Sequence, residues 1–173
     1  MNAIDIFGLL IPVTFVVLFA LERIWPARQF PPIRFWGLLG FGFLVQMALL
    51  ANLLPLLIPA DWQAQHRLLD GSRLGIVPGA LVGYLVYSFC AYWYHRATHS
   101  FAWLWRHTHQ LHHSSQRVDM AGSVIFHPFD IAIYVFLSVI TSSLILGLDP
   151  LAAAITGYIA SFYSFFQHLN MRT

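Results

Sequence analysis

The chain has 173 residues, of which 58% are hydrophobic and only 9% are charged, with a formal net charge of +2. Soluble domains carry about 25% charged residues, so this composition excludes an ordinary soluble domain and a disordered chain. The small net charge gives no sign of nucleic-acid binding. The single cysteine, Cys90, excludes an internal disulfide and a cysteine-based zinc or iron–sulfur site. The sequence therefore predicts an integral membrane protein.

Five apolar stretches are each close to the about 20 residues that cross a bilayer. They cover residues 4–21, 35–58, 74–94, 131–148 and 151–167. The last two are short enough to be re-entrant or tilted elements, and the turn residues Asp149-Pro150 between them predict a helical hairpin. The fold class that follows is an all-α membrane protein with about five transmembrane or re-entrant helices. We divide it into membrane spans at 1–90 and a histidine-rich region at 91–173.

Small and aromatic residues predict how these helices pack and where they end. Gly79 and Gly83 share one helix face, which is typical of closely packed membrane helices. The tryptophans lie at or just outside the ends of the apolar stretches, as expected for an aromatic belt at the membrane interface. They are Trp25, Trp36, Trp62, Trp93, Trp103 and Trp105.

The arginines predict an orientation. The connections after the first and third stretches, together with the C-terminal tail, contain seven of the nine, and the opposite side contains only Arg67 and Arg73. Because cytoplasmic loops are enriched in basic residues, we expect the N-terminus outside and the histidine-rich segment and C-terminus in the cytoplasm. The membrane would be the inner or plasma membrane in a bacterium and the endoplasmic reticulum in a eukaryote. The seven are Arg23, Arg28, Arg34, Arg96, Arg106, Arg117 and Arg172.

Eight of the nine histidines are expected on one side of the membrane. His95 and His99 are four residues apart on the continuation of the third helix, so their rings lie on one face and can share a metal ion. A second group repeats this spacing, and its neighbours His112 and His113 diverge by about 100° around a helix. Two neighbouring rings that point to different places favour two metals over one. The candidate ligands are His95, His99, His109, His112, His113 and His168.

The remaining histidines have open interpretations. His107 is either an interfacial residue or a ligand. His127 precedes Pro128 and Asp130, which resemble the start of the fourth helix, so His127 is either a ligand or a hydrogen-bonding neighbour. Asp130 is a candidate for the same two roles. His66 lies on the opposite side and is interpreted as a surface residue.

The donor set favours iron. Neutral imidazoles suit iron, zinc, copper and nickel, and the zinc-protease and haem-attachment motifs are absent. A many-histidine site for two metals at the membrane interface fits iron and O₂ chemistry best, because redox-active iron can break an unactivated C–H bond and zinc cannot. The substrate would be a lipid of the adjacent bilayer.

The region from about residue 91 onwards resembles the fatty acid hydroxylase/sterol desaturase superfamily of membrane di-iron oxygenases. Residues 95–99 (HRATH) match its first histidine box, and 105–114 (WRHTHQLHHS) match its second. Residues 126–130 (FHPFD) and 166–170 (FQHLN) are similar to its step into the next hydrophobic hairpin and its single later histidine. The resemblance implies a histidine-ligated centre of two irons that uses O₂ to hydroxylate or desaturate a fatty acyl or sterol-like lipid. Asn170 is a further candidate ligand or neighbour of a ligand.

The chain departs from the family pattern in one respect and leaves alternatives open. The sequence stops before the family's third histidine box, so we expect a fragment or a natural truncation whose 173 residues alone do not hold two irons. One alternative function is a truncated, non-catalytic membrane protein with weak metal binding. A second is a divalent-metal transporter, although no stretch carries an ionisable residue near its middle. Without a flavin, nicotinamide or haem motif, an oxygenase of this kind would need a separate electron-donor protein. The sequence does not predict the oligomeric state.

Overall fold

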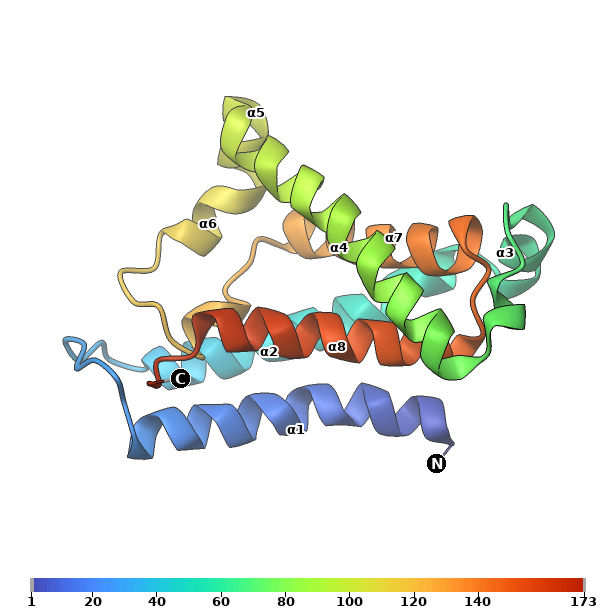
Figure 1. Ribbon diagram of the computed structural model, residues 1–173. Helices are drawn as coiled ribbons and strands as arrows, with labels where there is room; N and C mark the ends of the chain where they lie inside the picture. Colours follow the sequence, from blue (N-terminus) through green and yellow to red (C-terminus); the bar gives the residue numbers. More distant parts are fainter. Residues whose placement is uncertain (1, 173) are drawn as a thin grey trace.

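The computed structural model describes residues 2–172, which form helices joined by loops and contain no strand (Figure 1). Four helical segments are long and apolar enough to cross a membrane. They are α1 (Ala3–Ile24), α2 (Trp36–Leu53) with its 3₁₀ continuation η1 (Leu54–Leu57), α4 (Ile76–Ser100), and α7 (Pro128–Val139) with its π-helical continuation η5 (Ile140–Ile145). The chain is therefore an all-helical membrane protein.

The fifth predicted stretch forms α8 (Pro150–His168), a helix of 19 residues that is not among those four. Short elements complete the chain. Between the second and third spans lie α3 (Ala60–His66) and η2 (Gly71–Leu74), and between the third and fourth lie α5 (Ala102–Leu104), η3 (Trp105–His109), α6 (Gln110–His113) and η4 (Gly122–Val124).

Local sequence signals explain where the long helices begin. Asn2 and Asp5 cap the start of α1 through reciprocal hydrogen bonds between side chain and backbone. In α7 and α8 a proline occupies the first turn, where its missing N–H costs nothing. The residues before them, His127 and Asp149, accept backbone N–H bonds with their side chains. The helix start predicted at residues 127–130 is thus confirmed.

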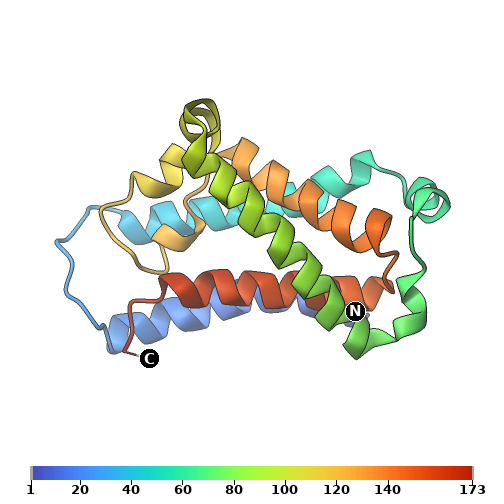
Figure 2. The ribbon, with the colours of Figure 1, turned by 45° about the horizontal axis from the view of Figure 1, so that its top comes forward.

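The long helices pack as two pairs that α4 crosses. Figure 2 shows α1 beside α8, and α2 beside α7, with α4 running obliquely over them. The predicted hairpin of the last two apolar stretches is therefore wrong as a packing unit, because α7 packs mainly against α2, while α8 packs against α1 and α4. A turn at Asp149 connects α7 to α8, but α8 packs against the small residues of α4 rather than against α7.

Two glycines explain the α4–α8 contact. A Cβ atom at Gly79 would lie 3.3 Å from the Cβ of Ala152, and one at Gly83 would lie 2.5 Å from the Oγ1 of Thr156. Thr156 in turn donates a hydrogen bond to the carbonyl of Ala80, 3.1 Å away on α4. The prediction of close packing at this glycine pair is confirmed, and the contact fixes α8 relative to the helix that carries His95 and His99.

A second apolar core holds the loop that follows the histidine-rich segment. Phe15 of α1 and Phe165 of α8 pack edge to face, with ring centroids 5.7 Å apart, and are buried together with Leu44, Met120 and Val124. Two of these, Met120 and Val124, belong to the loop between α6 and α7. The second half of this loop, residues 119–125, is thus buried between α1, α2 and α8.

Two tryptophans depart from the predicted belt: Trp105 lies against the rings of His99 and His113, and Trp36 is buried. This side chain is only 8% exposed, and its Nε1 donates to both carboxylate oxygens of Asp119, each 3.0 Å away. A hydrogen bond from the indole N–H to a buried acceptor stabilises this position more than a place at the membrane interface would. Trp25, Trp62, Trp93 and Trp103 are exposed, as expected for belt residues.

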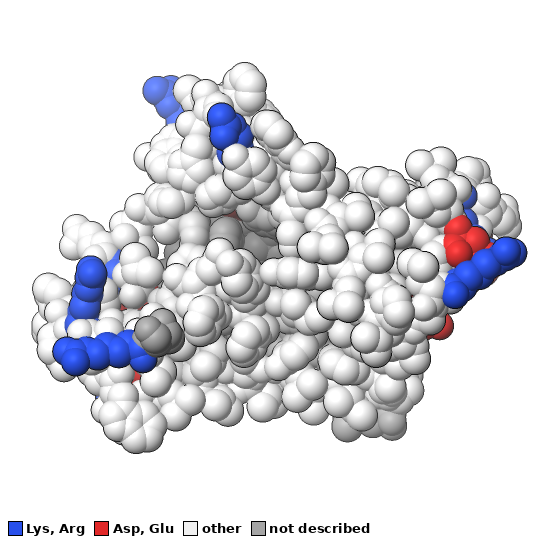
Figure 3. All heavy atoms as spheres, viewed as in Figure 1, with Lys and Arg blue, Asp and Glu red and all other residues white. Residues whose placement is uncertain are grey.

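The charged side chains gather at the two ends of the molecule. Figure 3 shows arginines at the left end, at the right end and on the raised tip near α5, with a largely uncharged surface between them. The C-terminal ends of α1, α4 and α8 and the N-terminal end of α2 lie at one end (Figure 1), and the seven arginines counted on the predicted cytoplasmic side belong to these elements and the loops beside them. Arg67 and Arg73 lie at the other end, where both pair with Asp70.

Candidate metal centre

Two consecutive helical pieces bring most of the candidate ligands together. The last turns of α4 carry His95 and His99, and the chain bends sharply at Phe101. It then returns through α5, the π-helical turn η3 and α6, which carry three more of the predicted histidines. A π-helical turn is rare and is frequently found at functional sites.

Four histidines form a group in which every member can reach one metal ion. Their ligating nitrogens all lie within 4.8 Å of one another, and the Nε2 atoms of His109 and His113 are 3.1 Å apart. The members are His95, His99, His109 and His113. The i, i+4 spacing predicted from the sequence is what places each pair on one helix face.

Hydrogen bonds fix the orientation of the central ring of this group. His109 is fully buried, and its Nδ1 lies 2.8 Å from Oδ2 of Asp130. The other oxygen of Asp130 accepts a hydrogen bond of 2.7 Å from the hydroxyl of Tyr94. Donation from Nδ1 to this carboxylate leaves Nε2 unprotonated and aimed at its three neighbours, an arrangement common behind metal-ligating histidines.

A second, adjacent group consists of His112 and His168. The Nδ1 of His112 donates to the carbonyl of Ile125 at 3.2 Å, and the Nδ1 of His168 donates to the carbonyl of Ser164 at 2.7 Å. The two Nε2 atoms then face each other at 3.2 Å. A neutral imidazole carries one N–H, so both Nε2 atoms are free to bind a metal. The ring of Phe126 stacks on His112, with centroids 4.0 Å apart.

The two groups diverge where the sequence predicts that they should. The rings of neighbouring His112 and His113 are 84° apart in orientation, with centroids separated by 5.2 Å. His113 faces the group of four, whereas His112 faces His168. The six candidate ligands therefore form two adjacent clusters that come from three separate parts of the chain.

The surroundings of His112 and His113 favour the uncharged form of these two rings. Burial, reinforced by nearby His168, lowers the pKa of His112 to about 3. Partial burial and nearby His109 also lower the pKa of His113. Neutral imidazole is the form that coordinates a metal, so the donor set fits a transition metal that prefers nitrogen.

The centre is open on one side. His95, His99 and His113 are exposed, whereas His109 is buried. In Figure 3 the surface is hollowed between α4, α6 and α8, the elements that carry the histidines. Small molecules can therefore reach the clusters from this side, while Asp130 is sealed behind them.

The other candidates lie outside the clusters. His107 bonds the carbonyl of Trp103 through Nδ1 at 2.8 Å and stacks on its ring. His127 caps α7 by accepting from the backbone N–H of Phe129 at 3.3 Å. Asn170 contacts the backbone of Arg28 rather than a histidine. His66 is exposed in α3, in agreement with its interpretation as a surface residue.

Several residues that shape the site were not identified from the sequence. Tyr94 and Phe126 immediately precede histidines, and their aromatic character gave no reason to single them out. Glu22 has a clearer signal in the sequence, because it is an acid in the last turn of an apolar helix. In the structure its side chain is only 5% exposed. Its role depends on contacts with residues that are 98 and 148 positions away.

Comparison with known proteins places the histidine-rich half in a described family. The fatty acid hydroxylase family model matches residues 80–173, which is more than half of the chain and includes all six clustered histidines. No curated protein and no solved structure matches the chain.

Proposed function

Because the chain belongs to the fatty acid hydroxylase family, we propose that it acts in a lipid-modifying oxygenase, where its six clustered histidines contribute ligands to a centre of two iron ions. Its substrate is a fatty acyl or sterol-like lipid of the surrounding bilayer, and its reaction is an O₂-dependent hydroxylation or desaturation. The family alone supports the broader statement of a membrane-bound lipid oxygenase. The metal count, the reaction and the substrate are our proposal.

One observation carries the proposal of two metals. Two sets of imidazole Nε2 atoms face each other at 3.1 and 3.2 Å, and they lie in adjacent but differently oriented groups. In each of three rings, His109, His112 and His168, the Nδ1 is occupied by an acceptor of its own. The free nitrogens therefore converge, and a metal ion is the partner that several unprotonated nitrogens can share.

Bound iron would supply the redox chemistry that activates O₂ towards an unactivated C–H bond. The residues of the chain hold and orient that centre. Asp130 keeps the proton of His109 on Nδ1, and Tyr94 keeps Asp130 in place. Phe126 covers one face of His112 and excludes water from it. The open side between α4, α6 and α8 admits O₂ and the reacting part of the lipid (Figure 3).

The overall reaction needs electrons from outside. In hydroxylation a C–H bond breaks, a C–O bond forms, and the second oxygen atom leaves as water after two electrons and two protons are taken up. In desaturation two C–H bonds break, a C=C bond forms, and both oxygen atoms leave as water with the same uptake. The chain has no flavin, nicotinamide or haem motif, so we propose that a separate donor protein supplies the electrons.

We also propose that the histidine end faces the cytoplasm. Seven arginines accompany the helix ends beside the clusters, and two accompany the opposite end. Basic residues near span ends favour the cytoplasmic side. An electron donor would then approach from the cytoplasm.

The reaction is tested with the protein in its native membrane under ¹⁸O₂. We expect lipid products that carry ¹⁸O if the protein hydroxylates, or that have lost two hydrogens, with ¹⁸O in water, if it desaturates. His109→Ala removes a ligand and should abolish the product, whereas His66→Ala, a histidine at the far end, should leave it unchanged. Equal product from wild type and His109→Ala would refute the proposed function.

A further inference from the structure

A buried acid on the first helix is hydrogen bonded to both segments that flank one half of the histidine centre. We propose that Glu22, together with Asn170, is a positioning residue that holds His112 and His168 face to face. This inference rests on the proposed metal centre and adds a residue from outside the region matched by the family, residues 80–173.

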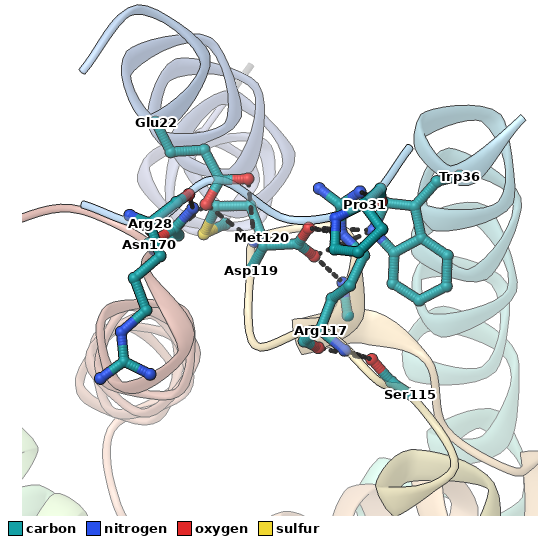
Figure 4. A network of polar contacts seen from close by, with 10 residues as sticks. Glu22, Arg28, Pro31, Trp36, Ser115, Arg117, Asp119, Met120 and Asn170 are labelled. Carbon is teal, nitrogen blue, oxygen red and sulfur yellow. Dashed lines mark hydrogen bonds and ion pairs between the residues drawn. The ribbon is translucent and has the colours of Figure 1, made fainter. Parts of the chain in front are cut away.

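Glu22 lies in the last turn of α1 and makes all its hydrogen bonds to backbone groups (Figure 4). Its two carboxylate oxygens accept from the N–H of Met120 at 3.1 and 3.0 Å, and Oε2 also accepts from the N–H of Asn170 at 3.2 Å. One carboxylate therefore ties the loop after α6 to the segment after α8.

Asn170 fastens the second of these segments. Its Oδ1 accepts from the N–H of Arg28 at 3.0 Å, its Nδ2 donates to the carbonyl of Arg28 at 2.9 Å, and its own carbonyl accepts from the N–H of Ala27 at 2.9 Å. Only one residue separates Asn170 from His168. These bonds fix the exit of α8 and so restrict where the last turn of that helix places the ring of His168.

The loop after α6 connects Glu22 to the other ring of the pair, that of His112. Met120 follows Asp119, whose side chain accepts from Trp36, Arg117 and the N–H of Gly122. The N–H of Ile125 then donates to the carbonyl of Gly122 at 3.2 Å, and the carbonyl of Ile125 accepts from Nδ1 of His112. Hydrogen bonds and short stretches of backbone thus connect Glu22 to His112 through the loop, and a direct hydrogen bond connects Glu22 to the backbone two residues after His168.

The chemistry of Glu22 favours this positioning role over simple packing. A buried carboxylate is costly unless its oxygens are hydrogen bonded, and an apolar residue of similar size is often as stable or more so. The rest of α1 contacts α8 mainly through apolar side chains such as Phe15, together with one hydrogen bond of 3.2 Å between the hydroxyls of Thr14 and Tyr158. Apolar contacts allow sliding, whereas a carboxylate bonded to two backbone N–H groups fixes the relative position of their segments.

The experiment measures Co²⁺ binding by the purified full chain in lipid nanodiscs, using the visible absorption of the bound ion and the number of ions bound per chain. His168→Ala defines the signal of the His112–His168 half. We expect Glu22→Ala and Asn170→Ala to lose the same spectral component, with Co²⁺ affinity of that half reduced about 10- to 100-fold, the usual effect of removing a group behind metal ligands. Glu22→Gln keeps one acceptor oxygen and should lie between wild type and Glu22→Ala.

The spectral component that remains in His168→Ala reports the group of four histidines and serves as the folding control. Asp5→Ala changes an acid at the opposite, exposed end of the same helix and should leave both components intact. If Glu22→Ala fails to fold, Asn170→Ala decides, because the hydrogen bonds of its side chain are made to the backbone of Arg28. If His168→Ala loses the spectral component of the His112–His168 half but Asn170→Ala and Glu22→Gln retain it fully, the positioning role is refuted. The proposed metal centre is not affected by that result. If His168→Ala itself loses no spectral component, that result contradicts both the two-metal centre and the positioning role.

Discussion

Substitution of Gly83 by alanine tests whether the α4–α8 contact is as close as the structure has it. The added Cβ would lie 2.5 Å from Oγ1 of Thr156 and 2.7 Å from Cδ1 of Leu148. Both distances are too short, so Thr156 must move, and its hydrogen bond to the carbonyl of Ala80 is lost or weakened. The substitution should therefore destabilise the protein even though alanine is the better helix former.

The magnitude follows from three contributions. Overpacking costs about 1–3 kcal/mol, and loss of an interhelical hydrogen bond in a membrane costs about 0.6 kcal/mol. The gain in helix propensity offsets up to about 1 kcal/mol. We expect Gly83→Ala to lower the free energy of unfolding by about 0.5–2.5 kcal/mol. Gly157 on α8 has no atom within 4 Å of an added Cβ, so Gly157→Ala should be neutral or stabilising by up to about 1 kcal/mol.

The assay is reversible unfolding in lipid nanodiscs or bicelles, with the two alanine variants compared under the same conditions. Thr156→Ala in the Gly83→Ala background should recover part of the loss, because it removes the closest atom, and the double-mutant cycle measures that coupling. A Gly83→Ala variant as stable as Gly157→Ala would show that α4 and α8 are not in this contact, and the relative placement of His168 and His95 would then be incorrect.

Three further predictions concern the centre and its orientation. Asp130→Asn should weaken Co²⁺ binding about 10- to 100-fold because His109 loses its charged acceptor, and Tyr94→Phe should have a smaller effect; a metal titration measures both. His107→Ala should leave the metal content unchanged, since this ring bonds to the backbone away from the clusters, and a loss of metal would assign it a ligand role. A reporter fused to the C-terminus should be cytoplasmic and one inserted near Gln65 external, and the opposite labelling would reverse the orientation.

Residues that depend on helix periodicity were predictable from the sequence. The pairing of His95 with His99 and the divergence of His112 from His113 follow from 3.6 residues per turn. The convergence of His168 with the others followed from counting spans, although α8 is a less apolar helix than the other four. Each of these inferences needs only local geometry and the thickness of a bilayer.

Residues that depend on which helices pack together were not predictable. The hairpin prediction was wrong because the glycine face of α4 and the apolar face of α1 hold α8, and the order of elements along the chain contains no such information. The position of Trp36 at the start of an apolar stretch predicts an interfacial residue. Its partner Asp119 is 83 residues away. The bonds of Glu22 span 98 and 148 residues and are equally invisible to pattern analysis.

The central claim is that six histidines in two groups hold two iron ions, and iron-edge X-ray absorption with iron quantification on the protein purified from its native membrane tests it most directly. We predict two irons per protein with a first shell made mainly of imidazole nitrogen, and loss of iron in His112→Ala, because no neighbouring side chain can replace that ring opposite His168. Iron bound mainly by oxygen, or an iron content in His112→Ala equal to that of the wild type, would contradict the account.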